Sequence, residues 1–184
     1  MAEPKVCVSL EAITVEEMID EATRANIAGA DYVEVRFDKL YLNKPEPITM
    51  VNDDGEEYSK MPPIEEWGVK DFEEIDVEQA IANLKEGIPV PVVFTARAVR
   101  EGGFFAGTEQ ERLQILEQGI KSEVSFVDLE LSIEKKSRDK LVKLASSSNC
   151  QVIASIHETK ATPSAEEIVT MVKDNSSQGD IIKF

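Results

Sequence analysis

Polar side chains recur at alternate positions near the ends of short apolar segments, and their types are suited to chemistry on a small polar molecule. A histidine or a carboxylate can transfer protons, an arginine can bind both oxygens of a carboxylate, and a lysine amine can attack a carbonyl. The charged or titratable positions with this spacing are Glu34, Arg36, Arg97, Asp128, Glu130, His157 and Lys183, joined by the hydroxyl residues Ser9, Thr95 and Ser155.

The cost of burying charge makes this pattern informative. An unpaired buried charge costs several kcal/mol, whereas a whole domain is stable by only ~5–15 kcal/mol. The charged residues must therefore pair with one another, remain in water or bind a ligand. Simpler roles stay open for single residues: Lys183 as a lysine on an edge strand, His157 as a core histidine, and Asp128 as either an exposed strand tip or a structural support.

Six short segments rich in Val, Ile or Phe must position these side chains. They contain too few polar residues to be half-exposed strands, so we predict parallel strands that are covered on both faces. Each has an aliphatic face and carries a polar group on the other face, usually near its C-terminal end. The predicted strands are Lys5–Leu10, Asp31–Phe37, Pro91–Arg97, Phe126–Leu131, Gln151–His157 and Asp180–Phe184.

Helix signals occupy the gaps between these strands, and a repeated β-α pattern predicts a parallel sheet with right-handed crossovers. In such folds ligands bind at the carboxyl ends of the strands, where the polar residues lie. The signals are possible capping boxes at Thr14 with Glu17 and Thr108 with Glu111, a cap at Asp76 with a stop at Gly87, a cap at Thr162 before Pro163, and a helix over Glu134–Ser146.

One segment, Tyr41–Phe72, departs from the β-α rhythm. The turn residues 52–55 separate two short strand-like stretches, Ile48–Val51 and Glu56–Tyr58, so we predict a hairpin excursion after the second strand. Six strands suit an open sheet, whereas a closed β/α barrel has eight. The strand count alone leaves both architectures open.

Composition limits the partners of the chain. Its 184 residues carry 20 Lys and Arg against 36 Asp and Glu, a formal charge of -16, which disfavours nucleic acid and anionic membranes. No apolar run reaches the ~18 residues of a membrane span, and residues 1–5 do not resemble a signal peptide. Cys7 and Cys150 lack metal-ligand spacing, and we expect two buried free thiols in a reducing cytoplasm.

Five ordered motifs, followed by the last strand, resemble the type I 3-dehydroquinate dehydratase family. Each motif alone occurs widely, but the ordered set at these spacings is specific and covers nearly the whole chain outside the excursion. The motifs are Val8-Ser9-Leu10, Glu34-Val35-Arg36-Phe37-Asp38, Phe94-Thr95-Ala96-Arg97 running on to Arg100-Glu101-Gly102-Gly103, Val127-Asp128-Leu129-Glu130-Leu131, Ser155-Ile156-His157 with Thr162-Pro163, and Gly179-Asp180-Ile181-Ile182-Lys183.

The resemblance implies an α/β fold, a (β/α)8 TIM barrel of which residues 1–184 hold only the first six strands as one domain. Residues 41–72 are then an insertion after the second strand. In the family the last two β/α units supply an arginine for the substrate carboxylate and a mobile loop. We therefore expect this chain to be part of a longer protein or to be completed by another chain.

The resemblance also implies the reaction and the residues that carry it. Lys183 forms a Schiff base with the ketone of 3-dehydroquinate, and we expect apolar Ile181 and nearby arginines to favour its neutral amine. His157 transfers protons and Glu101 orients it. The residues that hold the substrate are Ser9, Glu34, Arg36 and Arg97. No metal or cofactor is implied, and the family suggests a homodimer.

Two other functions remain open. Another Schiff-base barrel, such as a class I aldolase, shares a lysine on the sixth strand, although the arrangement of Glu34, Arg36, Glu101 and His157 favours the dehydratase. A barrel piece that binds a ligand without turnover is the alternative outside the enzymes. The presence of the lysine, histidine and glutamate together argues against it.

Overall fold

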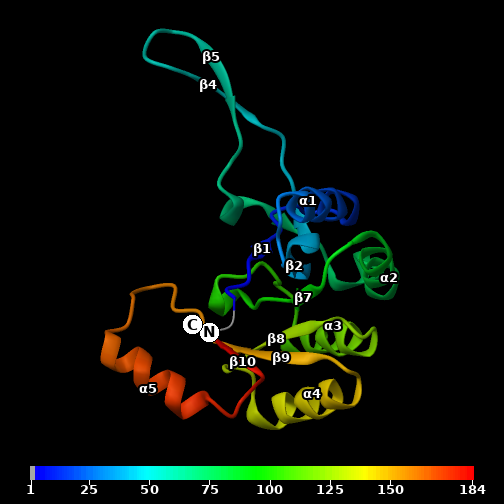
Figure 1. Cartoon of the computed structure of the whole chain (residues 1–184). Coiled ribbons are helices and arrows are strands. Elements are labelled where there is room, and N and C mark those ends of the chain that lie inside the picture. Colours follow the sequence, from blue (N-terminus) through cyan, green and yellow to red (C-terminus); the bar gives the residue numbers. More distant parts are fainter. Residues whose placement is uncertain (1–2) are drawn as a thin grey trace.

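The computed structural model describes residues 3–184 and is built on one curled parallel sheet (Figure 1). Its strand order is β1-β2-β7-β8-β9-β10, and every neighbouring pair runs parallel. The six predicted strands are confirmed, each somewhat shorter than expected. Their bounds are β1 Cys7–Ser9, β2 Tyr32–Arg36, β7 Val92–Thr95, β8 Phe126–Glu130, β9 Gln151–Ser155 and β10 Ile181–Lys183.

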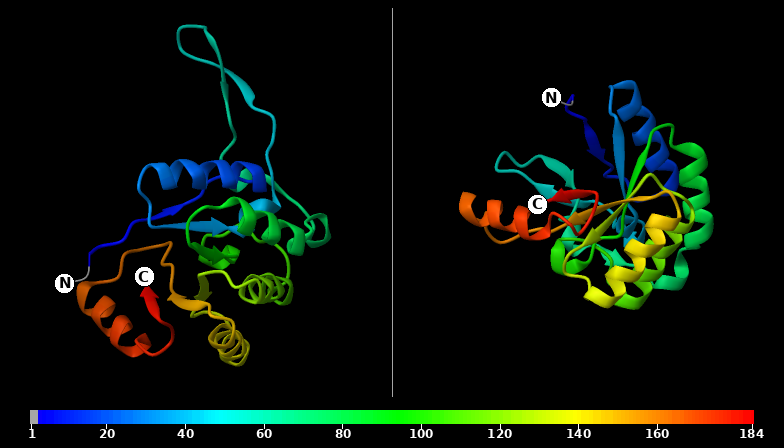
Figure 2. Two further views of the ribbon diagram at one scale, coloured as in Figure 1. Left: turned by 45° about the vertical axis from the view of Figure 1, so that its right-hand side comes forward. Right: turned by 60° about the horizontal axis from the view of Figure 1, so that its bottom comes forward.

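Five α-helices connect these strands and lie on the outer side of the curl (Figure 2). The arrangement is a half-barrel of β-α units, which confirms the predicted architecture of a partial α/β TIM barrel. Within residues 3–184, β1 and β10 are the two edges of the sheet and do not pair with each other. The helices are α1 Val15–Ile27, α2 Val77–Gly87, α3 Glu109–Lys121, α4 Lys135–Ser147 and α5 Ala165–Asn175.

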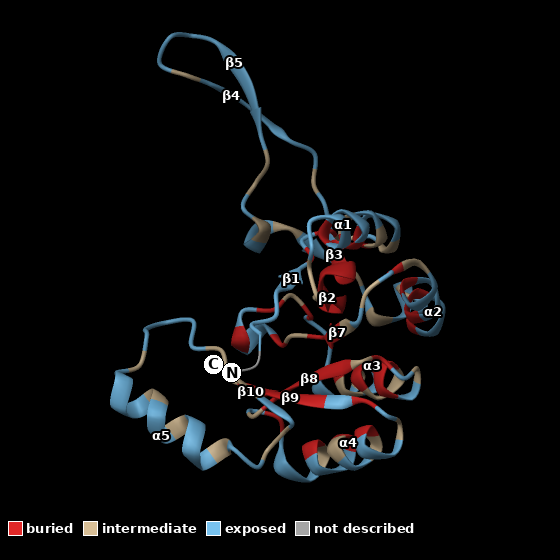
Figure 3. Ribbon diagram, in the orientation of Figure 1, coloured by how far each residue is buried: buried red, intermediate tan, exposed pale blue. Residues whose placement is uncertain are grey.

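The core fills the space between the sheet and helices α1 to α4 (Figure 3). Val33 and Val35 of β2 are fully buried, as are Val127 and Leu129 of β8. These residues alternate with polar ones along their strands, as the two-residue period of a strand requires. The predicted aliphatic outer face is therefore confirmed. The inside of the curl carries the predicted polar residues near the carboxyl ends of the strands, above a smaller apolar cluster of Val93, Phe126 and Ile153.

Helix starts were predicted better than helix ends. Thr108 and Glu111 form both bonds of a capping box at α3, and the Asp76 side chain caps α2. At α1 the Thr14 side chain accepts from the backbone N–H of Glu17, which is only half of the predicted capping box. Two other predictions were wrong. Gly87 is the last residue of α2 and not a stop beyond it, and α5 is capped by Ser164 instead of Thr162. Ser164 takes this position because Glu167, three residues on, completes a capping box with it.

The excursion after β2 begins in the core and ends in a hairpin that extends from the body (Figure 1). Its start, η1 Phe37–Tyr41, is buried, and β3 Leu42–Asn43 pairs with β6 Gly68–Val69. The hairpin joins β4 Ile48–Val51 to β5 Glu57–Lys60, and all eight strand residues are exposed. Two short 3-10 turns, η2 Ile64–Glu66 and η3 Phe72–Glu74, follow. The predicted hairpin is confirmed.

The two cysteines differ in burial. Cys150 is buried, as expected, but Cys7 is exposed, so that half of the prediction was wrong. Cys7 lies on an edge strand and faces the inside of the curl, where no further strand covers it among residues 3–184. Across the same residues, no helix has the length and apolar character needed to cross a membrane.

Candidate functional site

Lys183 lies between two carboxylates on the inner face of the sheet. Its Nζ is 2.9 Å from Asp128 Oδ2 and 3.2 Å from Glu34 Oε1. These two contacts link β10 to β8 and to β2. Both are contacts that an ammonium group makes. We expected arginine side chains near this amine, and Arg97 is one: its Nη2 lies 3.0 Å from the same Glu34 Oε1 that contacts Lys183 Nζ. Glu34 thus lies between the two cationic groups.

Glu34 is the centre of the polar contacts on this face. Its Oε1 accepts hydrogen bonds from Thr95 Oγ1 at 2.8 Å and from Arg97 Nη2 at 3.0 Å, and its Oε2 accepts one from the Ser9 hydroxyl. Burial opposes the charge of this carboxylate, but Lys183, Ser9 and Arg97 outweigh that cost and lower its pKa to about 2. Glu34 is therefore a fixed negative charge beside the lysine.

Asp128 is buried, with 2% of its surface exposed, so it is not a strand tip in water. One oxygen contacts Lys183 and the other accepts the hydroxyl of Ser155, which is fully buried on β9. The exposed strand tip is thus excluded for Asp128, and its bonds to Lys183 and Ser155 agree with the structural support that was left open. Its neighbour on the same face, Glu130, turns instead toward α3.

His157 is held by Glu101 at the end of the next strand. The Glu101 Oε2 lies 2.9 Å from His157 Nδ1 and also accepts the backbone N–H of His157 at 3.2 Å. Burial opposes ionisation of Glu101, but its bonds from His157 and Ser132 lower its pKa. A carboxylate can only accept, so we assign the proton of neutral His157 to Nδ1. The other nitrogen, Nε2, has no hydrogen-bond partner within residues 3–184.

Arg36 was predicted to contact the substrate, but in this structure its guanidinium is bound to Asp38. Its Nε and Nη2 bind the two oxygens of Asp38 at 2.9 and 2.7 Å, and its guanidinium lies 5.8 Å from the centre of the Phe104 ring. Burial disfavours the charge of Arg36, but Asp38 more than compensates and raises its pKa. Its role toward a substrate stays a prediction.

Asp38 was quoted in the sequence motif without a role. It is fully buried and also accepts the backbone N–H groups of Arg97 and Phe104, both at 3.1 Å. These contacts fix both ends of the loop that carries Glu101. The spacing of Arg36 and Asp38 could have predicted this ion pair, because an arginine and a carboxylate two residues apart at a strand end can form a bidentate contact.

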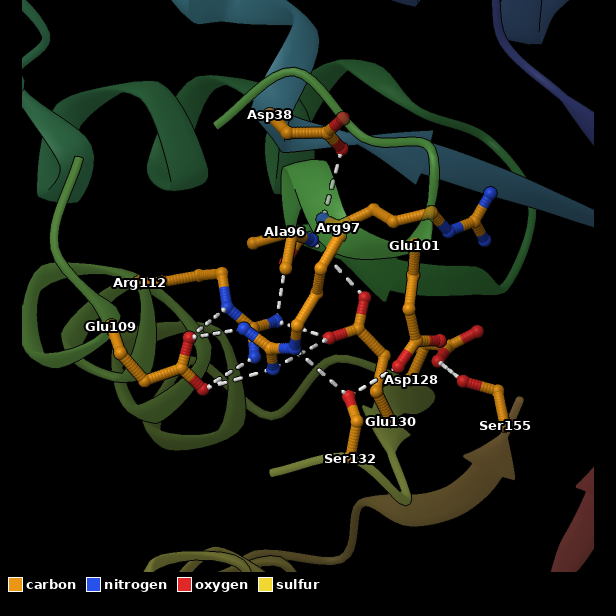
Figure 4. Close-up of polar contacts among 12 residues, drawn as sticks. Asp38, Ala96, Arg97, Glu101, Glu109, Arg112, Asp128, Glu130, Ser132 and Ser155 are labelled. Carbon is orange, nitrogen blue, oxygen red and sulfur yellow. Dashed lines mark hydrogen bonds and ion pairs between the residues drawn. The ribbon is translucent and has the colours of Figure 1, made fainter. Parts of the chain in front are cut away.

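A second group of residues supports the ends of β7 and β8 (Figure 4), and of its side chains only Glu130 was marked by the sequence pattern. Buried Arg112 of α3 lies 2.8 Å from Glu130 Oε2 and donates to the backbone oxygen of Ala96 at 2.8 Å. Glu130 also accepts the backbone N–H of Ala98 at 3.1 Å. Burial raises the pKa of Glu130 despite Arg112. These contacts hold the backbone on both sides of Arg97, at Ala96 and Ala98.

Two hollows adjoin the site. One of about 610 Å³ runs along the inner face and is lined by Cys7, Ser9, Glu34 and Lys183 together with apolar residues. The other, about 400 Å³, is lined by His157 and by the segment that leads into α5. Phe184 lines both. The structure thus gathers Lys183, Glu34, Ser9 and Arg97 in one cluster and places the His157 pair beside it.

Glu101, Glu130 and His157 are the one grouping with metal-ligand potential in the described part of the chain. Each presents a ligand atom, and the three atoms lie within 4.8 Å of one another. The two carboxylates are already bound, Glu101 by the histidine and Ser132, and Glu130 by Arg112. We therefore interpret these residues as a hydrogen-bonded network.

Comparison with known proteins identifies one family. The family model described as type I 3-dehydroquinase matches residues 6–184. The 3-dehydroquinate dehydratase of Methanocaldococcus jannaschii is 34% identical over 131 residues, covering 70% of this chain and 57% of that protein. The enzyme of Methanosarcina acetivorans is 29% identical over 176 residues, covering 94% and 61%. The chain thus spans about three fifths of the length of these relatives.

Solved structures agree on the fold. A type I 3-dehydroquinate dehydratase from Clostridium difficile with covalently modified comenic acid superposes with a TM-score of 0.71 at 23% identity, covering 97% of this chain and 60% of that one. The 3-dehydroquinate dehydratase of Geobacillus kaustophilus gives 0.72 at 21% identity, covering 98% and 60%. At these identities the likeness supports the fold alone.

Proposed function

Because the chain belongs to the type I 3-dehydroquinase family, we propose that it takes part in the dehydration of 3-dehydroquinate to 3-dehydroshikimate, with Lys183 as the covalent nucleophile. This makes the protein a lyase. The observation that carries the proposal is the convergence of a lysine, two carboxylates and a glutamate-held histidine at the carboxyl ends of parallel strands. Ligands of such folds bind at these ends.

The first step is condensation of the Lys183 amine with the substrate ketone. Nζ bonds to the carbonyl carbon, the oxygen leaves as water, and a protonated imine remains. The amine must first give up a proton, and it lies against Glu34 and Asp128, which can stabilise the positive charge that returns in the iminium. Lysine is suited to this step because its amine is a nucleophile, whereas an arginine in the same position is not.

The second step removes a proton from the carbon next to the iminium. We assign this to His157 Nε2, the ring nitrogen that Glu101 leaves unoccupied. The electron pair forms an enamine, which then expels the hydroxyl group on the next carbon. His157 returns its proton to that group, which leaves as water, and hydrolysis of the new iminium frees the ketone and Lys183. Protons and atoms balance without a metal or cofactor.

The substrate is a polyhydroxylated keto acid, so its polar groups need charged and hydroxyl partners. Ser9, Glu34 and Arg97 already form a connected group beside Lys183, and we propose that they exchange these mutual bonds for bonds to the substrate. Arg36 joins them if its pair with Asp38 opens toward the substrate. At a wider scale, we place the reaction in the shikimate pathway in the cytoplasm, with a homodimer as the expected assembly.

An activity assay separates this proposal from the aldolase alternative. The enone product of dehydration absorbs in the ultraviolet, so 3-dehydroquinate and a panel of aldol substrates can be compared on the same preparation. We expect product from 3-dehydroquinate and none from the aldol panel. Aldol cleavage without dehydration contradicts the proposal, and a folded protein that binds 3-dehydroquinate without turning it over supports the binding-module alternative.

A further inference from the structure

Ser132 lies in the turn after β8 and contacts the residue that holds His157. A hydrogen bond from the backbone N–H of Ile133 to the carbonyl of Glu130, 3.0 Å long, closes this turn. The Ser132 hydroxyl then reaches the neighbouring strand end and donates to Glu101 Oε1 (Figure 4). Neither the sequence motifs nor the reaction steps above give this residue a role.

The direction of the Ser132 bond is fixed by its second partner. Arg100 Nε lies 3.2 Å from Ser132 Oγ and can only donate, so the serine oxygen accepts from Arg100 and its proton points to Glu101. Arg100 is itself held by two bonds to Glu109, at 3.0 and 3.3 Å. The orientation of the Ser132 hydroxyl is therefore set by Arg100 and Glu109 and does not depend on His157.

Each oxygen of Glu101 has a separate task. Oε1 accepts from Ser132, whereas Oε2 accepts from His157 Nδ1 and from the His157 backbone. A carboxylate that is bonded on one side only can rotate about its terminal bond. The Ser132 bond opposes that rotation, so it determines where Oε2 lies relative to the imidazole.

We propose that Ser132 is a positioning residue whose hydroxyl holds Glu101 in the orientation that keeps the proton of neutral His157 on Nδ1. The ring nitrogen Nε2 then remains unprotonated and available as the base. This inference rests on the proposed function for its catalytic consequence, but the tautomer of the histidine is a property of the resting protein and can be measured without substrate.

His157 is the only histidine in the chain, so its ring nitrogens give a single pair of signals in nitrogen-15 NMR of the untagged protein. The chemical shifts distinguish a protonated ring nitrogen from an unprotonated one. Wherever the ring is neutral, we expect the parent protein to show mainly the Nδ1–H form. In Ser132→Ala the Nε2–H form should become populated, and Ser132→Thr, which keeps a hydroxyl, should restore the parent pattern.

The kinetic expectation is a change in kcat and little change in KM. Ser132→Ala should lower kcat about tenfold, less than the ~10²–10⁴-fold that a general acid–base group itself contributes. KM should stay within about twofold, because Ser132 contacts Glu101 and Arg100 and none of the proposed substrate contacts. Ser132 is an exposed residue, so we expect the variant to fold.

Ser137→Ala is the matched control. Its hydroxyl also donates to a glutamate, Glu134 Oε2 at 3.1 Å, but at the start of α4. This variant should leave tautomer and kcat unchanged. An unchanged tautomer in Ser132→Ala overturns the inference, even if kcat falls. A shifted tautomer in a protein that does not dehydrate 3-dehydroquinate leaves the inference intact and counts against the proposed function.

Discussion

Glu34 illustrates how one residue links stability and chemistry. Its folded pKa of about 2 lies below the ordinary value of 4.5 because Lys183, Ser9 and Arg97 outweigh the cost of burial. A carboxyl group with a lowered folded pKa contributes stability that is present above its unfolded pKa and is lost as the pH falls toward the folded value. For Glu34 that window extends from about pH 5 down to about pH 2.

We predict that Glu34→Gln lowers the free energy of unfolding at neutral pH by about 3 kcal/mol, which corresponds to the size of this pKa shift. The difference from the parent should shrink as the pH falls through that window, because the parent loses the same contribution. Urea unfolding at several pH values measures both. The control is Glu117→Gln, whose exposed pair with Lys121 should contribute under ~1 kcal/mol. A pH-independent difference contradicts the account.

Residue types and strand parity predicted most of the candidate site. Lys183, Glu34 and Arg97 lie on one face because side chains alternate along a strand, and that alternation is visible in the sequence. The parts that were missed depend on contacts between elements. Ser132 and Arg112 reach the site from a turn and a helix, and nothing in their neighbours along the chain marks them. Which carboxylates contact Lys183 was also missed, because it depends on which strands lie opposite β10 in the curled sheet.

At the scale of elements, the loop from Arg97 to Phe104 carries Glu101, and one buried side chain binds both of its ends. Asp38 follows β2 and binds Arg36 through both oxygens, while the backbone N–H groups of Arg97 and Phe104 bind the same carboxylate. Gly103 allows the tight path of this loop, since a Cβ there would lie 2.1 Å from the Arg97 carbonyl oxygen. The position of Glu101 therefore depends on β2.

We predict that Asp38→Asn lowers the free energy of unfolding by roughly 3–5 kcal/mol, the usual cost of breaking a buried ion pair. The reason is that Arg36 stays buried with a neutral partner that cannot accept all four bonds. Chemical denaturation measures the change. Asp139→Asn makes the same substitution in an exposed pair with Lys135 and should change stability by under ~1 kcal/mol. Equal losses in both variants contradict a special role for Asp38.

Helix starts were predictable because a cap is a local interaction. Thr108 and Glu111 are three residues apart, and the hydrogen bonds between them form within one turn. Helix ends and the start of α5 were less predictable, because Thr162 and Ser164 both qualify as caps and the glutamate at Glu167 decides between them. The exposure of Cys7 depended on its place at the sheet edge, which no local pattern reports.

At the scale of the whole molecule, the site exists only because the sheet curls. Glu34 and Lys183 are 149 residues apart in the chain, and Asp128 and Lys183 are 55 apart, yet they meet on the inner face. Six parallel strands bring these groups together through right-handed crossovers. The number of predicted strands alone was compatible with an open sheet and with a barrel. The curl of the observed sheet shows the barrel geometry.

Trapping the covalent intermediate tests the central claim, the Schiff base on Lys183, most directly. The protein is incubated with 3-dehydroquinate, treated with borohydride to reduce any iminium, digested, and the modified peptide located by mass spectrometry. Lys183→Arg keeps a positive charge beside both carboxylates but has no amine, and Lys173→Arg is the matched control at an exposed lysine. We predict a stable adduct on Lys183 in the parent and the control, and none in Lys183→Arg. An adduct on another lysine, or none in a folded parent protein, contradicts the account.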